Sequence, residues 1–146
     1  MSKTHQLNCY FKSKRLMLWF TWFTRILLFI AFLPSGYKKF ANQRFTLLGI
    51  DNPIGFFFEA LYVSGFYWQF LGLMQLMAGF LLLIPRTTFL GALIYFPIIL
   101  NIFVIVTSMH FTGTPIVAGL MLLANLWLIF WDFDKFHSIC KIIFEL

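Results

Sequence analysis

Four polar side chains stand inside long apolar runs of the sequence, where a hydrogen-bonding group is costly. They are Arg25, Gln75, Asn101 and Asn125. Counting the helical rise along each run predicts comparable depths in the membrane for the four. An arginine at the centre of a bilayer costs roughly 2.5–3.5 kcal/mol on insertion scales, so we expect these residues to face the bundle interior. The guanidinium of arginine has five N–H donors in a fixed fork, which suits a carboxylate, a sulfonate or a quinone oxygen. These side chains could therefore bind an oxygen-bearing molecule within the membrane.

The same residues also have a purely structural interpretation. Amides between membrane helices contribute about 0.6 kcal/mol each and can fix the register of the helices without any ligand. The apolar run around Arg25 contains no acid, and the candidate partners for its charge are Glu59 and Asp132. Structural pairing and ligand contact both stay open for Arg25.

Composition indicates which elements must position these side chains. Of the 146 residues, 61% are hydrophobic and only 11% are charged, whereas soluble domains have about 25% charged residues. A spanning segment must satisfy its own backbone hydrogen bonds, so we expect helices and an all-α fold. The predicted architecture is a transmembrane four-helix bundle with a short interfacial helix between spans one and two. The predicted spans are residues 16–35, 67–84, 88–108 and 115–132.

The basic residues predict an orientation in the membrane. Seven of the 11 Lys and Arg residues precede span one, lie between spans two and three, or follow span four. Three others fall in the first loop, namely Lys38, Lys39 and Arg44. Lys and Arg accumulate on the cytoplasmic side, so we expect a cytoplasmic N-terminus (1–15), a membrane domain (16–132) and a cytoplasmic tail (133–146). We assign the net charge of +6 to this role and expect no nucleic-acid binding.

Several chemistries find no support in the residues of the spans. The three histidines lie outside the spans, so we expect neither a haem nor a metal ion. No catalytic constellation is visible, and the chain alone is not expected to be an enzyme. No acid inside the membrane could carry a coupling proton, which argues against the four-span small multidrug transporters. Cys9 and Cys140 form no CxxC pair, and both are expected on the cytoplasmic side.

Glycine spacing and the first loop predict how the helices pack. Gly65, Gly72 and Gly79 recur every seven residues on the face that carries Gln75, which predicts a close helix–helix contact. Residues 54–66 place large apolar side chains at helical spacing. This short helix is either an aromatic anchor in the membrane interface or a lid over a cavity, and both interpretations stay open.

Three stretches carry a resemblance to a known family. They are Arg25 in span one, "SGYKK" at 35–39 and "QLMAGFLLLIPRTTFLGAL" at 75–93. Through them the chain resembles, over about residues 20–133, the DoxX-like family of four-helix membrane proteins. Span two of that family commonly shows an acid, small residues, a glycine, an apolar stretch and an arginine. Gly79 and Arg86 match this pattern, and Gln75 stands where the family has the acid.

The resemblance implies a protein of the bacterial cytoplasmic membrane. Family members include subunits of thiosulfate:quinone oxidoreductase and subunits of membrane oxidoreductase complexes in thiol or oxidative stress. Other members resemble a maturation factor for methylamine dehydrogenase. We therefore expect an accessory or redox-associated subunit that holds a quinone or another lipophilic ligand at the four polar residues. The alternatives are a membrane subunit of an oxidoreductase complex with a soluble partner, or a purely structural assembly or scaffold protein. Homo-oligomerisation is compatible with each.

Overall fold

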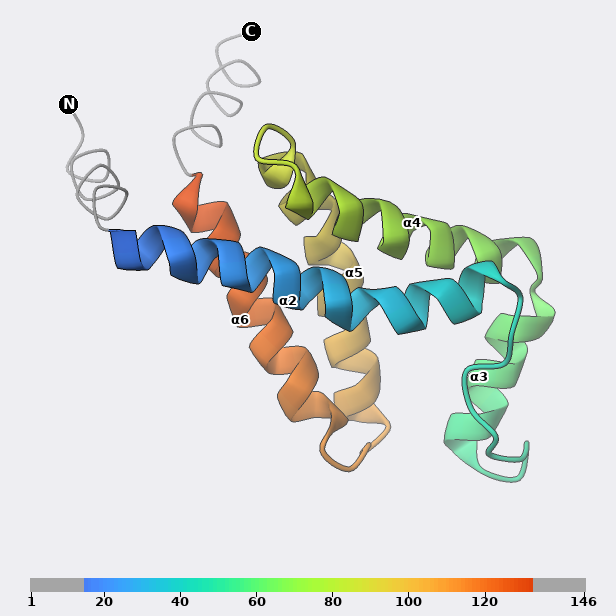
Figure 1. The fold of residues 1–146 in the computed structure, drawn as a ribbon. Helices are drawn as coiled ribbons and strands as arrows, with labels where there is room; N and C mark the ends of the chain where they lie inside the picture. Colours follow the sequence, from blue (N-terminus) through green and yellow to red (C-terminus); the bar gives the residue numbers. More distant parts are fainter. Residues whose placement is uncertain (1–14, 133–146) are drawn as a thin grey trace, which may run out of the picture.

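The computed structural model describes residues 15–132, and this part of the chain is built from helices. Four of the helices are long and apolar enough to cross a membrane, and the short helix α3 (Pro53–Val63) follows the first of them (Figure 1). The four are α2 (Arg15–Phe40), α4 (Phe66–Leu83), α5 (Thr88–Ser108) and α6 (Thr114–Trp131). The predicted all-α fold with four spans and a short helix between the first two is confirmed.

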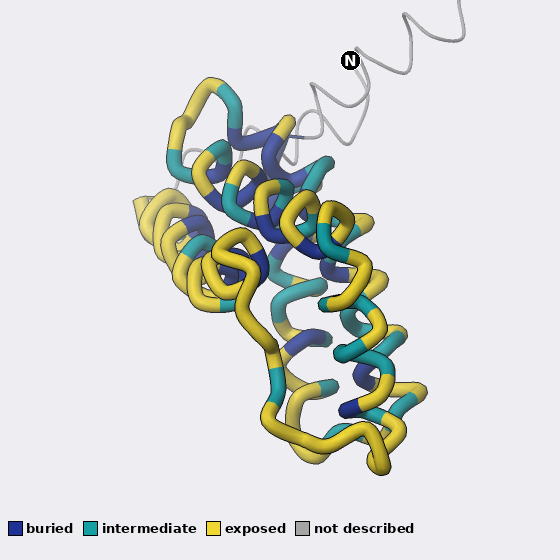
Figure 2. Tube along the Cα trace, turned by 90° about the vertical axis from the view of Figure 1, so that its right-hand side faces the viewer, coloured by how far each residue is buried: buried dark blue, intermediate teal, exposed yellow. Residues whose placement is uncertain are grey.

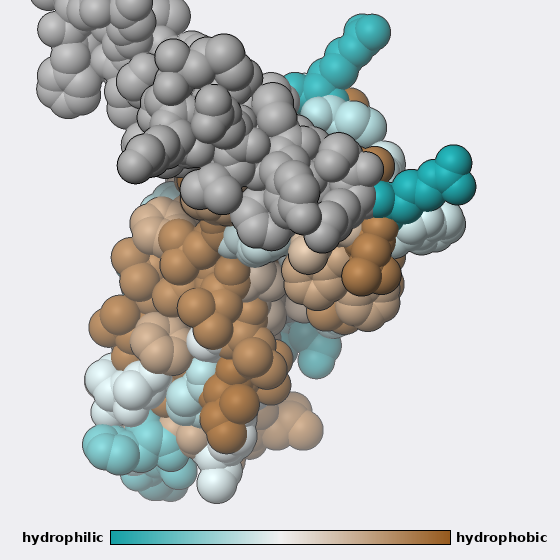
Figure 3. Space-filling view, turned by 90° about the vertical axis from the view of Figure 1, so that its left-hand side faces the viewer, coloured by the Kyte–Doolittle hydropathy of each residue, from teal (hydrophilic) through white to brown (hydrophobic). Residues whose placement is uncertain are grey.

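The spans form two hairpin-like pairs that cross each other. α2 packs most extensively against α4, α5 packs against both α4 and α6, and α2 meets α6 over a smaller area. In Figure 1 the α2–α4 pair runs across the α5–α6 pair at a steep angle. Buried positions gather where the pairs meet, and exposed positions lie outside (Figure 2). The face seen in Figure 3 is largely hydrophobic around its middle, as expected of helices that face lipid.

The core draws on all four long helices, and one of its contacts joins α2 to α5. The Phe32 and Tyr95 rings stack with their centroids 3.8 Å apart. The Tyr95 hydroxyl donates a hydrogen bond to the Leu28 carbonyl at 3.3 Å. A buried hydroxyl thus gains its partner from a helical carbonyl, which avoids the cost of an unpaired polar group.

The first span is longer than the sequence indicates. We expected it to end at residue 35, but α2 continues through Pro34 to Phe40. Proline removes one backbone donor from a helix, yet the turns beyond it pack tightly against α4. Lys38 and Lys39 therefore belong to the last turn of α2 and not to a loop.

The glycines of the seven-residue repeat have different surroundings. A Cβ atom on Gly72 would lie 2.4 Å from the Phe40 backbone nitrogen and 2.7 Å from the Gly36 carbonyl oxygen. A Cβ on Gly79 would lie 3.1 Å from the Phe29 ring. Gly65 differs from the prediction, because no atom lies within 4 Å of its Cβ position and its φ is +63°. Gly65 thus provides the left-handed junction between α3 and α4.

Candidate ligand-binding site

The four polar residues predicted as one site do not come together at one depth. Gln75 contacts the end of α2, where its side-chain oxygen accepts a hydrogen bond from Lys39. Lys39 follows Arg25 by 14 residues on the same helix, which corresponds to about 21 Å along the axis. Arg25 and Gln75 therefore lie in different parts of the bundle, contrary to the depth expected from the sequence.

Arg25 is buried, with 6% of its surface exposed. Its guanidinium carbon lies 5.2 Å from the centroid of the Trp22 ring, and Asp132 interacts with it electrostatically. Its Nε atom has no hydrogen-bond partner among the described residues. Glu59, the other acid considered for Arg25, instead forms an ion pair with Arg44 at 2.7 Å.

The two asparagines have contrasting environments. Asn125 is fully buried, and its Nδ2 donates to the Ala92 carbonyl at 3.1 Å, so it ties α6 to α5. Asn101 is exposed and lines a groove beside α3 and α4. This differs from the expectation that every polar residue of the spans faces the bundle interior. A ligand-binding role for either asparagine stays a prediction.

Lys39 is the site residue that the sequence reasoning missed. Only 5% of its surface is exposed. Its Nζ donates to Gln75 Oε1 at 3.1 Å and to the Ser35 hydroxyl. The same nitrogen lies 4.8 Å from the centroid of the Phe45 ring and 5.3 Å from that of Trp68. The one available signal was its spacing, because in a helix that continues past Pro34 residue 39 shares a face with Ser35.

Lys39 and Ser35 line a cavity of about 190 Å³ where α2 ends and α4 begins. Phe45 and Trp68 also line it, and α3 closes one side with Phe57, Phe58 and Leu61. The cavity thus has a cation and a hydroxyl on one wall and aromatic rings around them. α3 covers one side of the cavity, as the lid interpretation expects, and its exposed Phe56 and Val63 suit the interfacial anchor, so both interpretations stay predictions.

The charge of Lys39 has no acidic partner among the residues that line the cavity. The hydrogen bonds that the Lys39 ammonium donates to Ser35 and Gln75 satisfy its N–H groups without neutralising its charge. Aromatic faces attract a cation by about 0.5–2 kcal/mol, whereas an unpaired buried charge costs considerably more. The cavity is therefore electrostatically suited to a ligand with a carbonyl or anionic oxygen.

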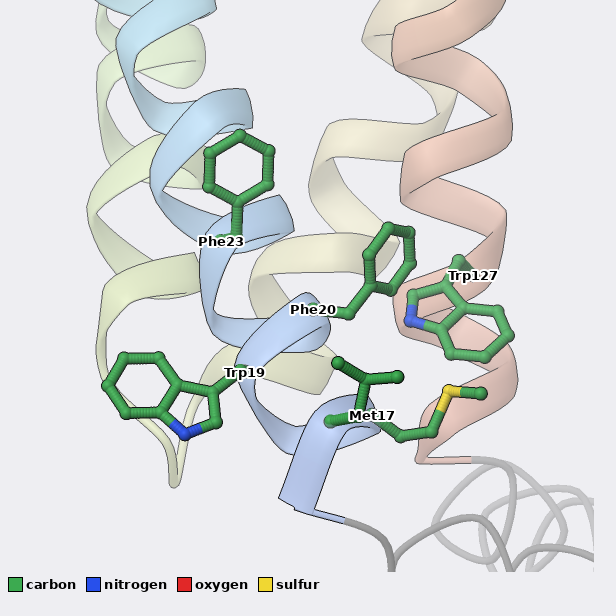
Figure 4. A pocket seen from close by; sticks show the side chains of 6 residues that line it. Met17, Trp19, Phe20, Phe23 and Trp127 are labelled. Carbon is green, nitrogen blue, oxygen red and sulfur yellow. The ribbon is translucent and has the colours of Figure 1, made fainter.

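A second hollow lies at the opposite end of α2, and its chemistry is different. This open groove of about 730 Å³ is lined by Leu16, Met17, Trp19, Phe20, Phe23 and Trp127. Figure 4 shows Phe20 of α2 and Trp127 of α6 side by side at this groove, where their rings pack edge to face with centroids 5.5 Å apart. No charged side chain lines the groove, so it can accept lipid chains but offers little to orient a polar group.

The comparisons with known proteins give one curated relative. The chain is 38% identical over 78 residues to the uncharacterised protein YwoB of Bacillus subtilis (strain 168). The alignment covers 53% of this chain and 50% of that protein, so the chain matches about half the length of its relative. No family model matches the chain. No solved structure matches it either.

Proposed function

We propose that this multi-pass membrane protein holds a lipophilic molecule with an oxygen-bearing head group, such as a quinone, in the Lys39 cavity. The observation that carries the proposal is the buried ammonium of Lys39, which has an aromatic-walled cavity beside it and no acidic partner in that wall. A carbonyl or anionic oxygen of a ligand in the cavity would interact favourably with the positive charge of Lys39. The protein itself need not catalyse a reaction to hold such a molecule.

The lining residues suggest how a head group is held. Lys39 donates to the ligand oxygen, and the Ser35 hydroxyl can donate beside it because its oxygen already accepts from Lys39. The rings of Phe45 and Trp68, which already contact Lys39, place apolar surface beside the head group. The cavity of about 190 Å³ is smaller than the roughly 300–1,000 Å³ of most ligand pockets, which favours a head group over a whole lipophilic molecule.

Gln75 adds a charge argument to the proposal. Its Oε1 accepts from Lys39, so a carboxylate at this position would form a buried ion pair and neutralise the cation. A neutral amide orients the ammonium and leaves its charge for a ligand. The DoxX-like proteins, which this chain resembles, commonly have an acid at this position. In our proposal, the replacement of that acid by Gln75 serves ligand binding.

The wider setting belongs to the same proposal. We place the protein in the bacterial cytoplasmic membrane with both termini on the cytoplasmic side, as an accessory or redox-associated subunit related to the DoxX-like proteins. The bacterial origin of the curated relative and the excess of basic residues near the predicted cytoplasmic ends support this placement. In this orientation the Lys39 cavity lies toward the outer side of the membrane.

The test is a binding measurement on purified protein in detergent, with tritiated decylubiquinone as the probe in a scintillation proximity assay. A hydrogen bond to a charged group contributes about 1.5–3 kcal/mol, so Lys39→Met should weaken binding at least about tenfold. Gln75→Glu should weaken it similarly without loss of thermal stability. The matched control is Lys38→Met, because Lys38 is exposed on the same turn.

The outcomes separate binding from packing. If Lys39 only ties α2 to α4, then Lys39→Met and Lys38→Met should bind the probe equally, because a buried polar pair can often be replaced by an apolar side chain of similar size. Equal binding by these two variants, or no binding to the wild type, would overturn the proposal. Circular dichroism and melting curves establish that each variant is folded.

A further inference from the structure

A groove runs beside the Lys39 cavity and shares part of its wall. The groove measures about 320 Å³ and lies among α3, α4 and α5. The side chains that line both the groove and the cavity are Phe57, Leu61, Leu71, Ile102 and Ile105. A single layer of apolar side chains therefore separates the two spaces.

The rest of the groove is apolar apart from a tyrosine and one amide. Pro97, Ile98 and Tyr67 line it together with Asn101, whose side chain is exposed. Among the residues that line the groove none is charged. This composition suits a flexible hydrocarbon chain and not a second polar head group.

We infer that the ligand is a single-chain amphiphile that enters from the bilayer, with its head in the Lys39 cavity and its chain in the groove. The inference rests on the proposed function, because it describes the same bound molecule. A cavity of about 190 Å³ cannot enclose a long hydrocarbon chain. The hydrocarbon chain of the ligand must therefore extend out of the cavity past one of its walls. The wall shared with the groove consists of side chains that can change rotamer, two of which belong to α3.

Two contacts that hold α3 in place can stay intact while the hydrocarbon chain of the ligand passes from the cavity to the groove. Arg44 pairs with Glu59, and the Phe45 and Phe58 rings stack with centroids 4.8 Å apart. Both contacts tie α3 to the preceding loop, and neither involves Phe57 or Leu61. Rotation of these two side chains would connect groove and cavity without unfolding α3.

The test compares a probe with a chain and a probe without one. Unlabelled decylubiquinone and ubiquinone lacking its side chain are each used to displace tritiated decylubiquinone from the full-length protein in detergent. Asn101→Trp fills the groove, and the matched control is Val104→Trp, because Val104 is exposed one turn later on α5 and lines neither space.

The inference predicts an effect that depends on the chain. Asn101→Trp should weaken the affinity for decylubiquinone about tenfold and leave that for the chainless quinone unchanged. Val104→Trp should change neither affinity by more than about twofold. Equal effects of Asn101→Trp on both probes, or no effect on either, would overturn the inference. Failure of the proposed function has a different signature, namely wild-type binding that is absent or insensitive to Lys39→Met.

Discussion

Replacing Gly72 by alanine should force apart the two helices that present the Lys39 site. The added methyl group would lie 2.4 Å from the Phe40 nitrogen, and an ordinary contact begins at 3.4 Å, so α2 must shift by about 1 Å at that point. The opposing atoms belong to the backbone of α2 and cannot rotate away. The same shift would lengthen the hydrogen bond of 3.1 Å that Lys39 Nζ donates to Gln75 Oε1.

The magnitude follows from two opposing effects. Overpacking costs about 1–3 kcal/mol, and a rigid backbone neighbour places Gly72→Ala near the upper end. Alanine in place of a helical glycine returns up to about 1 kcal/mol, which leaves a net loss of about 2 kcal/mol. For the matched control, Gly79→Ala, the close atom is on the Phe29 ring, which can move. We expect a change within about 0.5 kcal/mol for the control.

The assay is reversible unfolding in mixed detergent micelles, followed by circular dichroism, with the free energy of unfolding as the readout. Gly72→Ala should be clearly less stable than both the wild type and Gly79→Ala. If both variants unfold alike, or if only Gly79→Ala is destabilised, the close approach of α2 and α4 at Gly72 is refuted.

Two further predictions concern charge and topology. Arg25 lines neither the cavity nor the groove, so Arg25→Leu should fold and retain the bound molecule, whereas loss of that molecule would restore Arg25 to the ligand site. Cys9 and Cys140, which lie outside the described residues, should resist an impermeant thiol reagent in intact cells, because both termini are predicted to be cytoplasmic. Efficient labelling of either cysteine would contradict the orientation.

The sequence predicts the fold better than it predicts the site, for a physical reason. Apolar runs of about 20 residues specify membrane helices almost by themselves, because lipid allows few other structures. Three of the four spans were therefore predicted to within about one residue of their helices. The end of α2 was missed because Pro34 is a usual stop signal, and tight packing against α4 overrides it here.

The site depends on how far each polar residue lies along crossing helices, which the sequence does not reveal. Depth counted from the span ends placed Arg25 and Gln75 together. Because α2 extends to Phe40, however, the residue of α2 that contacts Gln75 is Lys39. Lys39 was counted as a loop charge for the same reason. Asn101 was expected inside because amides avoid lipid, whereas the structure places it in the groove. Helix crossing therefore decides which predicted polar residues meet.

The central claim is that Lys39 holds a lipophilic, oxygen-bearing molecule, and the most direct measurement is the identity of what co-purifies. Wild type, Lys38→Met and Lys39→Met would be extracted from the same membranes in mild detergent, and bound small molecules would be identified and quantified by mass spectrometry. The account predicts a near-stoichiometric molecule with a carbonyl or anionic head in the wild type and Lys38→Met, and its loss from folded Lys39→Met. Equal amounts in all three proteins, or none in the wild type, would contradict it.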